Sequence, residues 1–151
     1  MLKTNSDKLV KISVQGEVSS PVFRTPYRIS ANGVPMILPG VGGITYNIRV
    51  GDPASGWEAD HVEPGVTIKN KESDDANMAL NILSNVGNEA VVASGDGKGS
   101  KGTVTGKHGG IEHVLVDFSR EAMERLLIGD KVLIKAFGVG LKLLDFPDVK
   151  V

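Results

Sequence analysis

Short runs in which apolar and polar residues alternate recur along this chain, and most are closely followed by a glycine. In residues 9–14, Val10, Ile12 and Val14 share one face and polar residues occupy the other. Similar runs occupy residues 44–50, 89–94, 103–105, 114–118, 131–137 and 141–144. Because a two-residue period is typical of half-buried strands, we predict a mainly β fold, a barrel or sandwich of short strands.

Two short helices are predicted between these strands. Ser73 can cap the first helix and Gly87 can end it, while Ser119 and Gly129 do the same for the second. The apolar spacing of the first helix predicts a buried stripe formed by Ala79, Ile82, Leu83 and Val86. The second is predicted to bury Ala122, Met123, Leu126 and Leu127.

The length of the chain fits one mainly β domain over residues 1–151. Residues 20–39 hold four prolines and should not supply central strands, because proline cannot donate to a strand ladder. Residues 148–151 still have a strand pattern, which indicates that the domain is the N-terminal part of a longer chain.

Composition argues against several classes of protein. The formal net charge of −1 makes general electrostatic binding of nucleic acid unlikely. The absence of cysteine excludes disulfides and thiolate chemistry. Neither a signal peptide nor an apolar run long enough to cross a membrane is visible, so we predict a cytoplasmic protein. A single glutamine and no cysteine fit a thermophile.

Residues 95–113 hold seven of the 19 glycines, three lysines and two of the three histidines. Residues 97–102 match the G-x-G-x-x-G pattern, but β-branched residues follow where a dinucleotide site needs a helix. The spacing of a phosphate-binding P-loop is also missing. We therefore reject both kinds of nucleotide site.

A second interpretation of this stretch is a pair of glycine-rich turns that bind an anion through backbone N–H groups. The ligand-binding candidates are Gly97, Lys98, Lys101, Lys107, Gly109 and Gly110. The competing interpretation is two ordinary hairpin turns with solvated lysines.

The histidines of this stretch, His108 and His113, are candidates for general acid/base catalysis, because imidazole titrates near neutral pH. Residues five apart face opposite sides of a regular strand. The glycines between them break that regularity and can let both side chains turn toward one centre. Asp60 is the third catalytic candidate.

An acidic loop is predicted at residues 51–65, and a loop of this length is often functional. Asp52, His61 and Glu63 are its candidate metal ligands, and with His108 or His113 they could hold a divalent metal ion. Trp57 is either a ligand platform, an interface anchor, or a cap on the core.

Several longer phrases, at residues 38–47, 51–65, 102–110 and 128–138, together resemble an uncharacterised prokaryotic family, a domain of unknown function with members in Thermotoga-like thermophiles. The resemblance covers most of the chain. It implies a mainly β architecture and members about twice as long as this sequence. It implies no established activity.

Three functions are compatible with these features. The first is a small-molecule enzyme or ligand-binding domain for a small anionic compound, assisted by a divalent metal ion. The second is an SH3-like barrel that binds RNA or the ribosome, which the charge balance and the 5% aromatic content disfavour. The third is a structural domain that forms a homo-oligomer, with Trp57 as the anchor.

Overall fold

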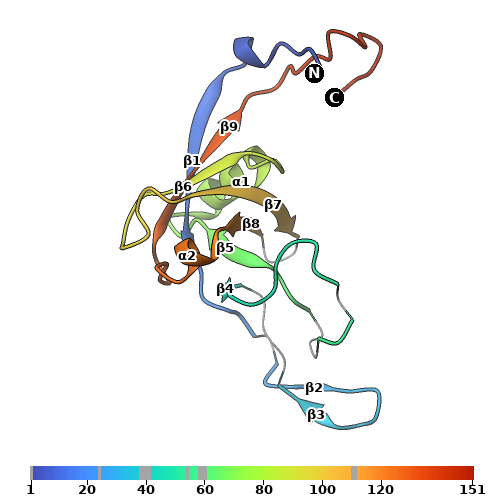
Figure 1. Ribbon diagram of the computed structural model, residues 1–151, viewed down its shortest axis with the longest axis vertical. Helices are drawn as coiled ribbons and strands as arrows, with labels where there is room; N and C mark the ends of the chain where they lie inside the picture. Colours follow the sequence, from blue (N-terminus) through green and yellow to red (C-terminus); the bar gives the residue numbers. More distant parts are fainter. Residues whose placement is uncertain (1, 24, 38–41, 54, 58–60, 110–111) are drawn as a thin grey trace.

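The computed structural model describes residues 2–23, 25–37, 42–53, 55–57, 61–109 and 112–151. Figure 1 shows the order of the elements along the chain. The strands are β1 (Lys11–Val18), β2 (Arg28–Ile29), β3 (Pro35–Met36), β4 (Ile44–Thr45), β5 (Gly65–Lys69), β6 (Glu89–Val92), β7 (Lys101–His108), β8 (His113–Phe118) and β9 (Lys131–Phe137). The helices are a 3-10 turn at Ser6–Lys8, α1 (Asp74–Leu83) and α2 (Arg120–Met123).

A closed antiparallel barrel forms the centre of the structure. Its strands follow the order β1-β9-β6-β7-β8-β5, and β1 pairs again with β5 to close the ring. Strand β4 is an additional strand beside β5. The prediction of a mainly β fold with two short helices is therefore confirmed, and the barrel is the correct alternative.

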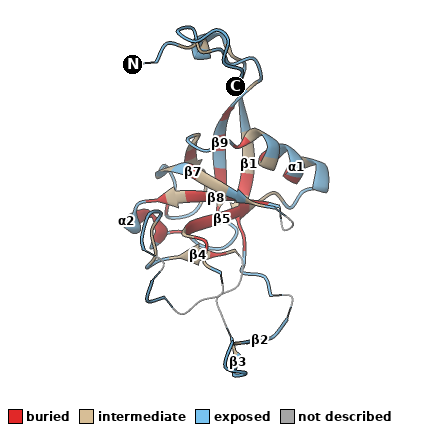
Figure 2. Cartoon of the chain, turned by 90° about the vertical axis from the view of Figure 1, so that its right-hand side faces the viewer, coloured by how far each residue is buried: buried red, intermediate tan, exposed pale blue. Residues whose placement is uncertain are grey.

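The core of the barrel is built from the alternation visible in the sequence. In β9, Val132, Ile134 and Ala136 are buried, whereas the residues between them are exposed or half-buried. In β8, Val114, Val116 and Phe118 make the equivalent inner face. Figure 2 shows the buried residues concentrated in the barrel strands.

Strand β5 was not predicted, and the strand predicted at 44–50 is mostly wrong. Val66, Thr67 and Ile68 are all buried, so both faces of β5 are covered and the expected alternation is absent. Only Ile44–Thr45 of the other segment forms a strand. Of the two C-terminal strand predictions, 141–144 gives one isolated bridge, between Leu143 and Thr4, and 148–151 gives none.

Both predicted helix caps are confirmed. The Ser73 hydroxyl accepts a hydrogen bond from the Ala76 N–H, and the Ser119 hydroxyl accepts one from the Ala122 N–H. Helix α1 ends at Leu83 rather than at Gly87, and α2 is a single turn that ends at Met123.

The predicted buried stripe of α1 is wrong. Ile82 and Val86 are exposed, and the buried residues of the helix are Asn77 and Leu80. This face is selected by tertiary contacts, because Leu80 covers Gly16 of β1 and Asn77 donates a hydrogen bond to the Glu112 carbonyl just ahead of β8. In the second helical segment Ala122, Met123 and Leu126 are buried as predicted, but Leu127 is exposed.

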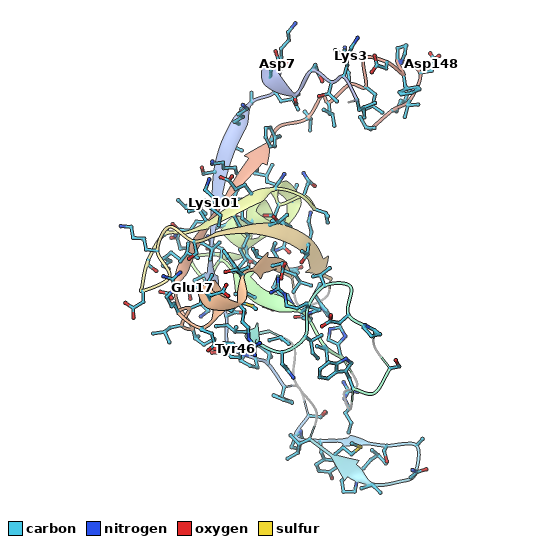
Figure 3. The ribbon with its side chains drawn as sticks, viewed as in Figure 1. Lys3, Asp7, Glu17, Tyr46, Lys101 and Asp148 are labelled. Carbon is cyan, nitrogen blue, oxygen red and sulfur yellow. The ribbon has the colours of Figure 1, made fainter. Side chains whose placement is uncertain are left out.

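Two parts of the chain extend away from the barrel (Figure 1). The β1–β9 ribbon continues into both terminal segments, which are held together by backbone hydrogen bonds such as Leu144 N–H to the Lys3 carbonyl. Figure 3 places Lys3, Asp7 and Asp148 in these segments, far from the barrel. The β2–β3 hairpin forms the other extension and lies in the proline-rich segment, whose described residues supply no barrel strand.

One glycine of β7 is required by the close approach of β8. A Cβ added to Gly102 would lie 2.5 Å from the Asp117 carbonyl oxygen, whereas a Cβ on Gly106 of the same strand would meet nothing closer than 3.5 Å. We expect Gly102→Ala to lower the free energy of unfolding by about 1–3 kcal/mol, the usual cost of overpacking. Gly106→Ala is the control and should remain within about 1 kcal/mol of wild type in urea titrations. Equal losses in both variants would contradict this account.

Candidate metal-binding site

All three histidines of the chain lie around one buried carboxylate, that of Glu63. The Nε2 atom of His113 is 2.9 Å from Glu63 Oε1 and 2.8 Å from Oε2. The Nε2 atom of His61 is 3.3 Å from Oε1, and that of His108 is 3.9 Å from it. Each imidazole therefore presents the same ring nitrogen to the same carboxylate oxygen.

A β-hairpin brings two of these histidines together. His108 ends β7 and His113 begins β8, and the two residues are directly opposite one another in the antiparallel ladder. Their rings stack with centroids 5.2 Å apart. Glu112, with φ at 57°, closes the turn by donating its N–H to the His108 carbonyl. The chain thus reverses between the two histidines, so the rule for residues five apart on one strand does not apply.

A β-bulge decides which face of β7 carries His108. Val104 pairs with Val116 and Gly106 pairs with Leu115, so Thr105 is an extra residue on β7. Val104 is fully buried in the core, and in a regular strand His108, four residues later, would point the same way. The bulge shifts this alternation by one residue. It thereby places His108 on the outer face of the barrel beside His113.

The segment that leads into β5 supplies the other two side chains. His61 and Glu63 are separated by one residue, and Gly65 begins the strand. Glu63 is held from the opposite side, because its Oε2 accepts hydrogen bonds from the Thr67 hydroxyl and the Gly42 N–H, each at 3.2 Å. The carboxylate is buried, whereas 43% of the His61 side chain is exposed.

Helix α1 fixes the end of the hairpin. The carbonyl oxygen of Glu112 accepts hydrogen bonds from Asn77 Nδ2 at 2.8 Å and from Asn81 Nδ2 at 3.1 Å. These bonds explain why the helix buries a polar residue at position 77. They also hold the turn immediately before His113.

The surroundings of Glu63 keep it ionised. Burial alone would raise the pKa of its carboxyl, but hydrogen bonding and charge attraction from His113, followed by hydrogen bonds from His61 and Thr67, outweigh burial and lower the pKa to about 2. An ionised carboxylate only accepts hydrogen bonds. The hydrogen bonds between His113 Nε2 and the ionised carboxylate therefore have the imidazole N–H as their donor.

The geometry of three of these residues suits a metal ion. One ligand atom each from His61, Glu63 and His108 can be chosen so that all lie within 4.8 Å of one another. In a tetrahedral zinc site with bonds near 2.1 Å, neighbouring ligand atoms are about 3.4 Å apart. The 3.3 and 3.9 Å separations from Glu63 Oε1 already approach that spacing. The buried Nδ1 atom of the His108 side chain has no hydrogen-bond partner among the described residues.

Comparisons with known proteins assign the chain to a family. A family model described as "Domain of unknown function (DUF4438), N-terminal" matches residues 27–151. The chain belongs to the DUF4438 family. The resemblance noted in the sequence is thereby confirmed, and a search of curated proteins found no match.

A solved structure supports the fold of this DUF4438 chain. The crystal structure of TM1086, from Thermotoga, is 54% identical in sequence and superposes with a TM-score of 0.88. The match covers 99% of this chain and 53% of the TM1086 chain. The DUF4438 chain described here therefore spans about half the length of that relative.

The structure separates the lysine-rich turn from the histidines. Gly97 and Lys98 lie in the turn before β7, and Lys101 begins that strand, whereas His108 ends it. Lys101 is 3.7 Å from Glu89. The N–H groups of Lys98, Gly99 and Ser100 donate to carbonyls within the turn or in β6, so they are already used.

The remaining predicted residues have mixed positions. Lys107 and Gly109 adjoin His108 in sequence and are exposed. Asp52 accepts a hydrogen bond from the Arg49 N–H within its own loop. The Trp57 side chain is 43% exposed and donates its indole N–H to the Pro53 carbonyl, so it does not cap the core. Asp60 and Gly110 lie outside the described residues.

Sequence reasoning missed two groups that hold Glu63. Thr67 lies in a β-branched run and has no local feature that distinguishes it from other strand residues. The Gly42 N–H is a backbone group, which no side-chain pattern can reveal. Their role follows only from the pairing of β5 and the path of the chain near β4.

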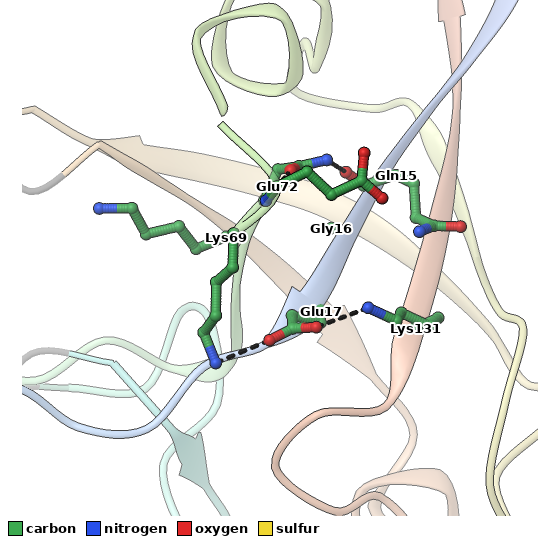
Figure 4. Close-up of a pocket in the computed structure, with 8 residues that line it drawn as sticks. Gln15, Gly16, Glu17, Lys69, Glu72 and Lys131 are labelled. Atoms are coloured by element: carbon green, nitrogen blue, oxygen red, sulfur yellow. Dashed lines mark hydrogen bonds and ion pairs between the residues drawn. The ribbon is translucent and has the colours of Figure 1, made fainter. Parts of the chain in front are cut away.

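A polar hollow of about 170 Å³ lies between β1, β5 and β9, apart from the histidine cluster. Figure 4 shows Glu17 at its centre, bound to two lysines. Glu17 is 2.7 Å from Lys71 Nζ and 2.6 Å from Lys131 Nζ, and the hydrogen bond from Lys131 is the main reason that the pKa of Glu17 is lowered. Both lysines are already paired with Glu17, so the charges of these three side chains largely compensate one another.

Among the described residues, no helix of this DUF4438 chain is long and apolar enough to span a membrane.

Proposed function

We propose that this chain binds a divalent transition-metal ion through His61 Nε2, Glu63 Oε1 and His108 Nε2, and that the metal ion binds a small anionic compound. The observation that carries the proposal is the convergence of three imidazole Nε2 atoms on one buried carboxylate oxygen. A charged group is seldom buried unless it is paired or coordinates a metal ion.

The donor set favours one class of metal. Two imidazole nitrogens and one carboxylate oxygen suit Zn²⁺, Fe²⁺, Mn²⁺ and Co²⁺, whereas Mg²⁺ and Ca²⁺ prefer oxygen ligands alone. Three protein ligands leave coordination positions open, as in catalytic rather than structural zinc sites. His61 and His108 are the more exposed members of the group, so these positions would face solvent.

The anion would be held by the metal ion rather than by lysines. Two neutral histidines and one carboxylate leave a bound divalent cation with one net positive charge. Lys98 lies in the turn before β7 and Lys101 begins that strand, so both are at the opposite end from His108 and cannot supplement this charge. In this proposal His108 is a ligand and His113 is a partner of Glu63, so neither has the general acid/base role suggested by the sequence.

Metal titration tests the proposal directly. We expect one Co²⁺ or Zn²⁺ per chain, and a loss of affinity of at least tenfold in His61→Ala. Asp52→Asn is the matched control, because Asp52 belongs to the same predicted loop but bonds only to Arg49 among the interactions seen. Added phosphate or oxalate should change the visible spectrum of the Co²⁺ form, equally in wild type and Lys98→Ala. Absence of stoichiometric metal binding would refute the proposal.

A further inference from the structure

Two sides of the Glu63 carboxylate have different surroundings. Its Oε2 is surrounded by three donors, namely the Thr67 hydroxyl, the Gly42 N–H and His113 Nε2. Its Oε1 is contacted only by the three histidine nitrogens among the interactions seen. Oε1 is therefore the carboxylate oxygen nearest to both His61 and His108, and the one that a cation held by these two imidazoles would meet.

Among the three histidines, His113 is chemically distinct. Only 2% of its side chain is exposed, against 43% for His61 and 28% for His108. Its Nε2 is 2.9 Å from Oε1 and 2.8 Å from Oε2, so it contacts both carboxylate oxygens. The Nε2 atoms of His61 and His108 are 3.3 Å and 3.9 Å from Oε1. The ligand atom of His113 is also outside the group formed by His61, Glu63 and His108 within the described chain.

From these observations we infer that Glu63 binds the metal through Oε1, and that His113 and Thr67 are positioning residues that hold the carboxylate from its buried side. This inference rests on the proposed metal function and deepens it. It assigns a centre with two histidine nitrogens and one carboxylate oxygen, not a centre with three histidines. The partners of metal ligands commonly fix ligand orientation, and their loss typically lowers metal affinity about 10–100-fold.

The presence of only three histidines makes nuclear magnetic resonance a clean test. In protein labelled with ¹⁵N-histidine, addition of one equivalent of Zn²⁺ should move the Nε2 signals of His61 and His108 to metal-bound positions. The His113 Nε2 signal should keep its directly attached proton before and after addition. His61→Ala and His108→Ala identify the signals.

Two variants test the role of Thr67: valine, which is nearly isosteric, and serine, which keeps the hydroxyl. Thr67→Val removes the hydroxyl that binds Oε2 and should weaken Zn²⁺ binding about tenfold. Thr67→Ser keeps the hydroxyl and should restore wild-type affinity. Melting temperatures measured without metal separate this effect from general destabilisation, because Thr67→Ser should rescue Zn²⁺ affinity whatever its melting temperature.

The possible failures are distinguishable. If wild-type protein binds no Zn²⁺, the proposed function is wrong and this inference falls with it. If Zn²⁺ binds and the His113 Nε2 proton is lost, His113 is a third nitrogen ligand and only this inference is overturned. Equal Zn²⁺ affinity in Thr67→Val and wild type would likewise overturn the positioning role of Thr67 alone.

Discussion

Replacement of Glu63 by glutamine should reduce Zn²⁺ affinity at least 100-fold. It should also lower the free energy of unfolding by about 3 kcal/mol, the lower end of the range for breaking a buried charged pair. The neutral amide removes the only anionic ligand of the proposed centre. It also places an NH₂ group against donors, because Thr67 and Gly42 donate to one carboxylate oxygen and His113 donates to both. Isothermal titration with Zn²⁺ and urea unfolding in EDTA measure the two effects separately.

Glu89→Gln is the matched control for that experiment. The pKa of Glu89 is also lowered, first by a hydrogen bond from Lys135 and then by the charge of Lys101, but this group lies on the exposed surface of β6. Its replacement should leave Zn²⁺ affinity unchanged and alter stability only slightly. If Glu63→Gln changed Zn²⁺ affinity and stability as little as Glu89→Gln, the buried carboxylate would not organise the site.

Acid should destabilise the metal-free protein through Glu63. The carboxyl has its ordinary pKa of 4.5 when the chain is unfolded, and a pKa of about 2 when it is folded. A folded-state pKa that is lowered gives stability that is complete above the unfolded value and is lost as pH falls toward the folded value. The difference corresponds to about 3 kcal/mol, all present above about pH 5 and lost progressively between about pH 5 and pH 2.

The comparison with Glu63→Gln isolates this contribution from those of other carboxyls. Urea unfolding of both proteins in EDTA should show a stability difference that is largest near pH 6 and shrinks steadily toward pH 2. Other carboxyls, such as Glu17, titrate equally in the two proteins and cancel. A difference that does not change with pH would mean that Glu63 has the same pKa in the folded and unfolded chains.

The other two functions considered from the sequence stay predictions. For RNA binding, the lysine-rich turn at the start of β7 is the relevant surface, but Lys101 is close to Glu89 and the turn N–H groups bond within the fold. For homo-oligomer formation, Trp57 is partly exposed, and the terminal segments expose further apolar side chains, including Val139 and Phe146. Neither observation bears on the histidine cluster.

The amino-acid sequence by itself determined the class of the fold and the positions of most strands. The alternation in residues 114–118 and 131–137 marks the inner faces of β8 and β9, because side chains alternate across a strand whatever its partners are. Local chemistry also fixed the caps at Ser73 and Ser119, since a cap bonds to backbone only three residues away. The candidate ligands were visible as residue types for the same reason.

Only the tertiary structure decided how these residues meet. His61 and Glu63 come from the segment before β5, a strand that lacks alternation because both of its faces are buried. His108 faces His113 because a bulge at Thr105 reverses the alternation of β7 and a hairpin sets the two in register. The pairing of β5 with β8 and the path of the chain near β4 then bring Thr67 and the Gly42 N–H behind the carboxylate. Most of these contacts join residues distant in sequence, and no local pattern encodes their distances or the burial of Glu63 among the three histidines.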